Sequence, residues 1–212
     1  MTNQLVIIDS GNCLKPIKGK IKKRHVEAKA NITHAKDLKY TGNNKYLLSI
    51  QDPVKRFISV FNFRLSKCIT NDSQMCKKTF NQPGKDEIHR YRYWGSIRRF
   101  AEDLYNANGE MHPLATRLIQ SSMDLRQDIS FYLADILPLI NRSNCKIIRY
   151  EHFCEDATRI LGINLSANVK FLQKSEPPKS QVSSKGLKNL KLLLTKDYKC
   201  FRLLKRKNLF EH

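Results

Sequence analysis

Residues 46–67, YLLSIQDPVKRFISVFNFRLSK, constrain the fold of this chain most strongly. They begin with a short apolar run at 46–50, which has the length and character of a buried strand. Asp52 and Pro53 follow, the first a good N-cap residue and the second the residue best suited to the first helical position. Apolar side chains then recur at helical spacing, at Val54, Phe57, Ile58, Phe61 and Leu65. The segment therefore predicts a strand, a tight turn and a helix, and in an open α/β sheet such a turn lies where ligands bind.

Further strands and helices are predicted on both sides of this unit, which favours an α/β fold with a central parallel sheet flanked by helices. Residues 4–9 and 146–151 have the character of strands, and residues 155–161 that of a helix closed by Gly162. Helices are also predicted at 86–106, 114–123 and 126–140, and over a final segment that starts near residue 187. The expected buried positions are Ile97, Phe100, Ala101 and Leu104 in the first of these, and Leu187, Leu190, Leu194, Tyr198 and Phe201 in the last.

The length of 212 residues predicts a single domain, 1–212, with a proper core, and the 41% of hydrophobic residues is typical of a folded chain. No apolar run is long enough to span a membrane, and the amino terminus lacks the pattern of a secretory signal, so a cytoplasmic protein is expected. The six cysteines show no metal-ligand spacing, and free thiols without a structural metal are predicted.

The net charge of +20, from 39 basic and 19 acidic residues, indicates anionic partners. Basic residues are concentrated at 15–24 and 185–207. Nucleic acid, an acidic glycan, a phosphate-rich cofactor and an anionic membrane surface all fit this balance, and simple solvation of helix faces fits it equally well.

The order of residues at 52–59, DPVKRFIS, resembles the 3′-phosphate-binding segment of carbohydrate sulfotransferases that use 3′-phosphoadenosine 5′-phosphosulfate (PAPS). The resemblance implies a three-layer P-loop-like fold and PAPS as co-substrate without a metal. It also implies that Ser59 and the residue at position 51 hold the 3′-phosphate, with Arg56 as part of the same cofactor segment. Gln51 stands where the family has an arginine, so a neutral amide replaces the charged guanidinium that would bind the phosphate through two hydrogen bonds.

In the same family the first strand leads into a loop that wraps the 5′-phosphosulfate through backbone N–H groups and a lysine. The corresponding residues here are Ser10, Gly11 and Asn12, with Lys15 as a source of charge. They retain a small, turn-forming character, but the Pro-Lys and Thr-Ser pairs of the family are absent.

The resemblance also implies a general base and an acceptor site. His34 occupies the place of the histidine that takes the acceptor proton, a role that suits the pKa of imidazole, and a surface or capping histidine is the alternative. His112 is an acceptor-site candidate from the resemblance. Arg92 and Trp94 are candidates because basic and aromatic residues alternate in their segment and suit binding of a sugar and of anionic groups, although core packing explains Trp94 equally well. Lys179 and Lys185 correspond to the loop that closes over the cofactor, whereas Glu151 is expected to hold the architecture together.

The predicted function is therefore transfer of a sulfonate group from PAPS to a carbohydrate hydroxyl, weak or absent if the missing charged contacts are not replaced. The alternative is a basic nucleic-acid-binding protein without catalytic activity. No known nucleic-acid-binding motif is present, which disfavours the alternative, and the absence of G-x-x-x-x-G-K-[ST] disfavours a P-loop kinase.

Overall fold

The computed structural model describes residues 5–9, 45–69, 85–162 and 182–210, which belong to two compact units. The first unit comprises Met1–Asp52, Ile129–Ser175 and Lys196–His212, and the second comprises Pro53–Asp128 and Glu176–Thr195. The described part of the chain is mostly helical with a small parallel sheet, so the predicted mixed α/β class is confirmed at this level.

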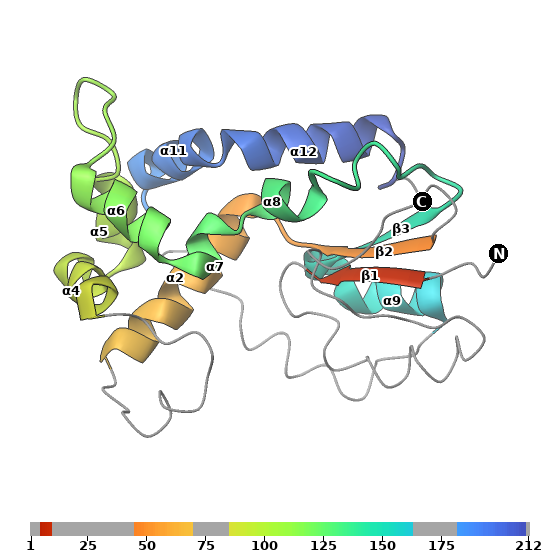
Figure 1. The fold of residues 1–212 in the computed structure, drawn as a ribbon, viewed down its shortest axis with the longest axis horizontal. Helices are drawn as coiled ribbons and strands as arrows, with labels where there is room; N and C mark the ends of the chain where they lie inside the picture. The colour runs from red at the N-terminus through yellow and green to blue at the C-terminus, as the bar shows by residue number, and fades with distance from the viewer. Residues whose placement is uncertain (1–4, 10–44, 70–84, 163–181, 211–212) are drawn as a thin grey trace. The chain divides into compact units, whose positions relative to one another are not determined.

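The sheet belongs to the first unit and has the order β1-β2-β3 (Figure 1). Its strands are β1 (Leu5–Asp9), β2 (Lys45–Ile50) and β3 (Cys145–Arg149), and both pairings are parallel. The strands predicted at 4–9 and 46–50 are thus confirmed. The strand predicted at 146–151 is shorter at its end, because the chain turns at Tyr150–His152 into a 3₁₀ helix, η2.

Helices of the first unit cover the sheet. They are α8 (Ile129–Leu133), α9 (Phe153–Leu161) and α12 (Thr195–Arg206). Alternate residues of β2 and β3 face α8 and α12, as expected from the period of two along a strand. That buried cluster contains Tyr46, Leu48, Ile50, Ile129, Leu133, Ile136, Ile140, Cys145, Ile147, Cys200, Leu204 and Leu209. Helix α9 contacts β3 and ends at Gly162, whose φ of 61° is left-handed, as expected for a helix-closing glycine.

The helix predicted over 126–140 is found only as the short α8, which is followed by turns. Pro138 explains part of this difference, because a proline lacks the N–H of a helical residue and its ring clashes with the preceding turn. The helix predicted at 114–123 corresponds to α6 (Pro113–Ser121) in the second unit.

The second unit is helical and contains α2 (Pro53–Ile69), α4 (Lys85–Trp94), α5 (Ile97–Glu102), α6, α7 (Met123–Arg126) and α11 (Ser184–Leu193). Aromatic rings form its centre. The ring centroid of Phe100 lies 4.9 Å from that of Phe61, 5.5 Å from that of Trp94 and 5.8 Å from that of Phe57. The apolar stripe predicted for 54–65 is buried throughout, so this prediction is confirmed.

The single helix predicted at 86–106 is instead two helices, α4 and α5, separated by Gly95 and Ser96. Gly95 has a φ of +65°, which glycine adopts without the penalty that a Cβ imposes. The hydroxyl of Ser96 accepts a hydrogen bond from the Arg99 N–H at 3.2 Å and so caps the new helix. The predicted core positions of this segment are nevertheless all buried.

The final predicted helix is likewise divided into α11 and α12, and Leu187 is 38% exposed where the prediction placed it in the core. Gly186 faces α5 in its place: a Cβ built on Gly186 would lie 3.0 Å from Ala101 Cβ and 2.9 Å from Val182 Cγ1. The Asn189 amide adds a hydrogen bond of 2.9 Å to the Ala101 carbonyl. Close helix contact therefore explains the glycine.

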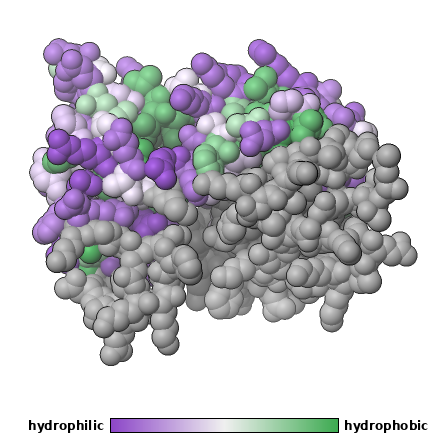
Figure 2. All heavy atoms as spheres, in the orientation of Figure 1, coloured by the Kyte–Doolittle hydropathy of each residue, from purple (hydrophilic) through white to green (hydrophobic). Residues whose placement is uncertain are grey.

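The visible surface of the described residues is largely hydrophilic, with hydrophobic side chains in small groups (Figure 2). None of the described helices has the length and apolar character needed to cross a membrane.

We predict that Gly186→Ala lowers the free energy of unfolding by about 1 kcal/mol or more, because overpacking against Ala101 outweighs the usual gain of alanine in a helix. Urea denaturation of G186A, A101G and the double variant tests this. The double variant is expected to recover much of the loss, and a stabilised G186A would contradict the close contact.

Candidate functional site

The carboxyl ends of the three strands meet at one edge of the sheet. Because all pairings are parallel, Asp9 lies opposite Ser49, and Ile50 lies opposite Arg149. The residues that follow β2 and β3, Gln51–Asp52 and Tyr150–Glu151, therefore leave the sheet side by side. This is the edge at which open α/β sheets bind their ligands.

Two hydrogen bonds connect the segments at this edge within the first unit. The backbone N–H of Asp52 donates to Glu151 Oε1 at 3.0 Å, and the Tyr198 hydroxyl donates to Asp52 Oδ2 at 3.3 Å. The neighbouring Asp197 is buried and accepts a hydrogen bond from the Ser130 N–H at 2.9 Å. Glu151 thus has the architectural role expected of it, and the Asp197–Tyr198 pair anchors α12.

Gln51 is the residue directly after β2, and it is only 6% exposed. A neutral amide tolerates this burial far better than the arginine of the resembled family would without a partner, because burying an unpaired charge is expensive. The burial therefore gives a physical reason for the amide at this position.

Arg56 and Ser59 belong to α2 in the second unit. Arg56 is 5% exposed, and its guanidinium donates to the carbonyl oxygens of Asp124, at 3.4 Å, and Gln127. Arg56 thus holds α2 to the segment around α7, which differs from the cofactor contact predicted for it. Ser59 is half-buried and keeps its place as a candidate.

Arg64, which the sequence reasoning missed, is a second buried arginine of α2. Its guanidinium forms an ion pair with the Asp124 carboxylate. The available signal was its spacing, because Arg64 lies one helical turn after Phe61 on the apolar stripe. A basic residue at such a position indicates a buried partner elsewhere in the chain.

The three acceptor candidates are all in the second unit, and the structure separates their roles. Trp94 is 1% exposed and packs edge-on against Phe100, which fits the alternative of core packing, and its acceptor role stays a prediction. The ring centroid of His112 lies 5.1 Å from that of Trp94. The His112 Nδ1 accepts a hydrogen bond from the Leu114 N–H at 3.1 Å. His112 is therefore the N-cap of α6. Arg92 donates to the Cys68 carbonyl at 3.3 Å.

The remaining candidates stay predictions. Ser10, Gly11, Asn12, Lys15, His34 and Lys179 all lie outside the described residues. Lys185 is exposed near the start of α11. Within the described ranges no group of three or more histidine, cysteine or acidic side chains is arranged to hold a metal ion.

The sequence reasoning did not identify Asp156, a fully buried carboxylate on α9 that connects this helix to β3. Arg149 donates to it from its backbone N–H at 2.8 Å and from two guanidinium nitrogens at 2.9 and 2.8 Å, and Arg159 donates at 2.8 Å. Burial raises the pKa of the Asp156 carboxyl, but these hydrogen bonds outweigh it and lower the pKa to about 2. The Asp156 cluster thus fixes the last residue of β3.

Comparisons with protein-family models, with curated proteins and with solved structures found no match to this chain.

We predict a pH-dependent contribution of Asp156 to stability. Its pKa is lower in the folded state than the ordinary value of 3.8, so the contribution is present above about pH 4 and is lost as the pH falls towards 2. The shift corresponds to about 2 kcal/mol. Chemical denaturation between pH 5 and 2 is the measurement. Arg159→Gln is expected to reduce the stability that is lost between about pH 4 and pH 2. Arg202→Gln, on the exposed face of α12, is expected to leave that pH-dependent loss unchanged. Identical pH profiles for wild type and R159Q would contradict the assignment.

Proposed function

We propose that the chain binds PAPS through the segment 51–59 and transfers its sulfonate group to a carbohydrate hydroxyl, with adenosine 3′,5′-bisphosphate as product. The observation that carries the proposal is the residue order DPVKRFIS at 52–59. This segment follows the middle strand of a parallel sheet, at the carboxyl edge of that sheet. We further propose a three-layer P-loop-like architecture and a cytoplasmic location.

The start of α2 suits an anionic ligand. This helix has 17 residues and no acidic residue in its first turn, so its N-terminal N–H groups and dipole favour a phosphate. Ser59 adds a hydroxyl on the same helix. The proposed general base, His34, and the proposed phosphosulfate loop, Ser10, Gly11, Asn12 and Lys15, complete the requirements of the reaction.

Two features predict weak binding. Gln51 replaces a charged phosphate contact, and hydrogen bonds to charged groups contribute roughly 1.5–3 kcal/mol. The carboxylates of Asp52 and Glu151 lie at the same edge of the sheet and repel an anion there. Low activity or cofactor binding without turnover is therefore part of the proposal.

Nucleic-acid binding is the second candidate, and the outer face of α12 favours it. The exposed side chains of this helix include Lys196, Lys199, Arg202, Lys205 and Arg206, whereas its acidic residue, Asp197, is buried. A helix face of this kind binds phosphate backbones without reading sequence.

The first test is calorimetric titration with adenosine 3′,5′-bisphosphate. We expect micromolar binding that Ser59→Ala weakens by about tenfold, because a hydrogen bond to a phosphate is lost. Ser66→Ala is the matched control, since Ser66 lies on the same helix and is exposed, with its hydroxyl bound to the Phe63 carbonyl. An equal effect of both substitutions, or no binding by the wild type, would overturn the proposal.

The second test restores charge at position 51. Gln51→Arg is expected to tighten binding of adenosine 3′,5′-bisphosphate by about tenfold or more, because the introduced guanidinium adds a charged contact to the 3′-phosphate. Thermal unfolding measured alongside reports the cost of the buried position. Unchanged affinity in a folded Q51R protein would count against this residue, and tight binding of single-stranded DNA without nucleotide binding would favour the second candidate.

A further inference from the structure

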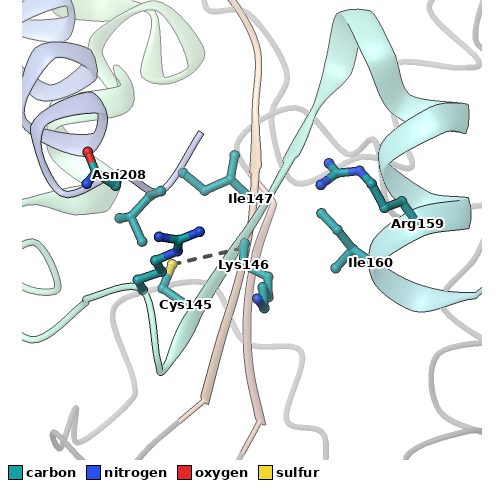
Figure 3. Close-up of a pocket in the computed structure, with 8 residues that line it drawn as sticks. Cys145, Lys146, Ile147, Arg159, Ile160 and Asn208 are labelled. Atoms are coloured by element: carbon teal, nitrogen blue, oxygen red, sulfur yellow. Dashed lines mark hydrogen bonds between the residues drawn. The ribbon is translucent and has the colours of Figure 1, made fainter. Parts of the chain in front are cut away.

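A pocket with a volume of about 430 Å³ lies at the amino end of β3, within the first unit (Figure 3). Strand β3 has five residues and is about 13 Å long. The pocket is therefore at the opposite end of this strand from the carboxyl edge, and it is separate from the proposed nucleotide site. Its size is in the range of sites for small organic ligands.

Side chains from several segments line the pocket, and none of them is acidic. Figure 3 shows Arg159 and Ile160 extending from α9 towards β3, with Asn208 on the other side of the strand. The complete lining is Arg142, Cys145, Lys146, Ile147, Arg159, Ile160, Asn208 and Leu209. Three cations thus border a floor made of a thiol and apolar side chains.

The wall formed by Asn208 and Leu209 is held by the end of α12. Asn208 has a φ of 55°, its N–H donates to the Lys205 carbonyl at 2.9 Å, and the Leu209 N–H donates to the Leu204 carbonyl at 3.2 Å. This is the Schellman pattern, and the buried pair Leu204 and Leu209 supplies its usual hydrophobic contact. The wall is therefore built by specific backbone geometry.

The charges of the pocket are only partly neutralised. Arg159 donates to Asp156, but that carboxylate also binds Arg149, so one negative charge serves two arginines. Arg142 and Lys146 are both exposed, and neither forms an ion pair within the described part of the chain. Burial raises the pKa of the Cys145 thiol to about 12, so this group adds no negative charge at neutral pH.

We propose that this pocket binds a small organic anion, with its phosphate or sulfate group at Arg142, Lys146 and Arg159 and its apolar body on Ile147, Ile160 and Leu209. Arginine and lysine form strong charge-assisted hydrogen bonds with phosphate and with sulfate groups. The apolar floor favours an organic anion over the inorganic ion, because only the former buries apolar surface. The site is independent of the proposed function.

Calorimetry with phenyl phosphate, phenyl sulfate and inorganic phosphate tests the inference. We expect saturable binding of one equivalent of phenyl phosphate or phenyl sulfate by the wild type, with weaker binding of inorganic phosphate; the better of the two organic anions identifies the head group. Arg142→Gln/Lys146→Gln is expected to weaken binding at least tenfold, since two charged contacts are lost. Lys188→Gln/Lys191→Gln on α11, which removes the same charge from exposed positions, is expected to change it less than about twofold.

A second variant tests the apolar floor. Ile160→Ser is expected to weaken phenyl phosphate binding while leaving inorganic phosphate binding unchanged, and thermal unfolding shows whether the variant is folded. The inference is overturned if the wild type shows no saturable binding, or if the α11 control loses affinity as much as the pocket variant. Loss of phenyl phosphate binding in Ser59→Ala would also overturn it, because the ligand would then occupy the proposed nucleotide site.

Discussion

The parallel pairing of β2 with β3 is the constraint on which the described structure depends. Parallel neighbours cannot be joined by a hairpin, so the chain must make a long crossover between Ile50 and Cys145. That crossover contains the first segment of the second unit, Pro53–Asp128. The same pairing brings Asp52 to Glu151, because both follow strands that end in register. The parallel pairing of β2 with β3 thus determines that Pro53–Asp128 lies in the crossover between them, and it also brings Asp52 next to Glu151.

The elements that local sequence determines were predicted well. Residues 46–50 form a middle strand that is buried throughout, which explains their continuous apolar character, and Pro53 begins the helix as its fixed φ favours. The break between α4 and α5 was missed although the signal was present, because Gly95 followed by Ser96 is a helix end followed by a cap. Apolar periodicity continued across the break and concealed it.

Charged residues inside the units could not be predicted in the same way. Arg56, Arg64 and Asp156 are buried because partners far from them, or on a neighbouring element, satisfy them. Sequence spacing alone does not show where such a partner will lie, and an unpaired buried charge would be unfavourable. Arg56 illustrates the consequence, since a family resemblance suggested a cofactor contact and the structure uses the guanidinium to hold two helices together.

The central proposal is that residues 51–59 bind a nucleotide, and hydrogen–deuterium exchange tests it most directly. With adenosine 3′,5′-bisphosphate present, peptides that cover residues 46–61 are predicted to exchange more slowly, whereas peptides from α12 and from the amino end of β3 remain unchanged. Protection confined to α12, or no protection at residues 46–61 at a saturating nucleotide concentration, would contradict the claim.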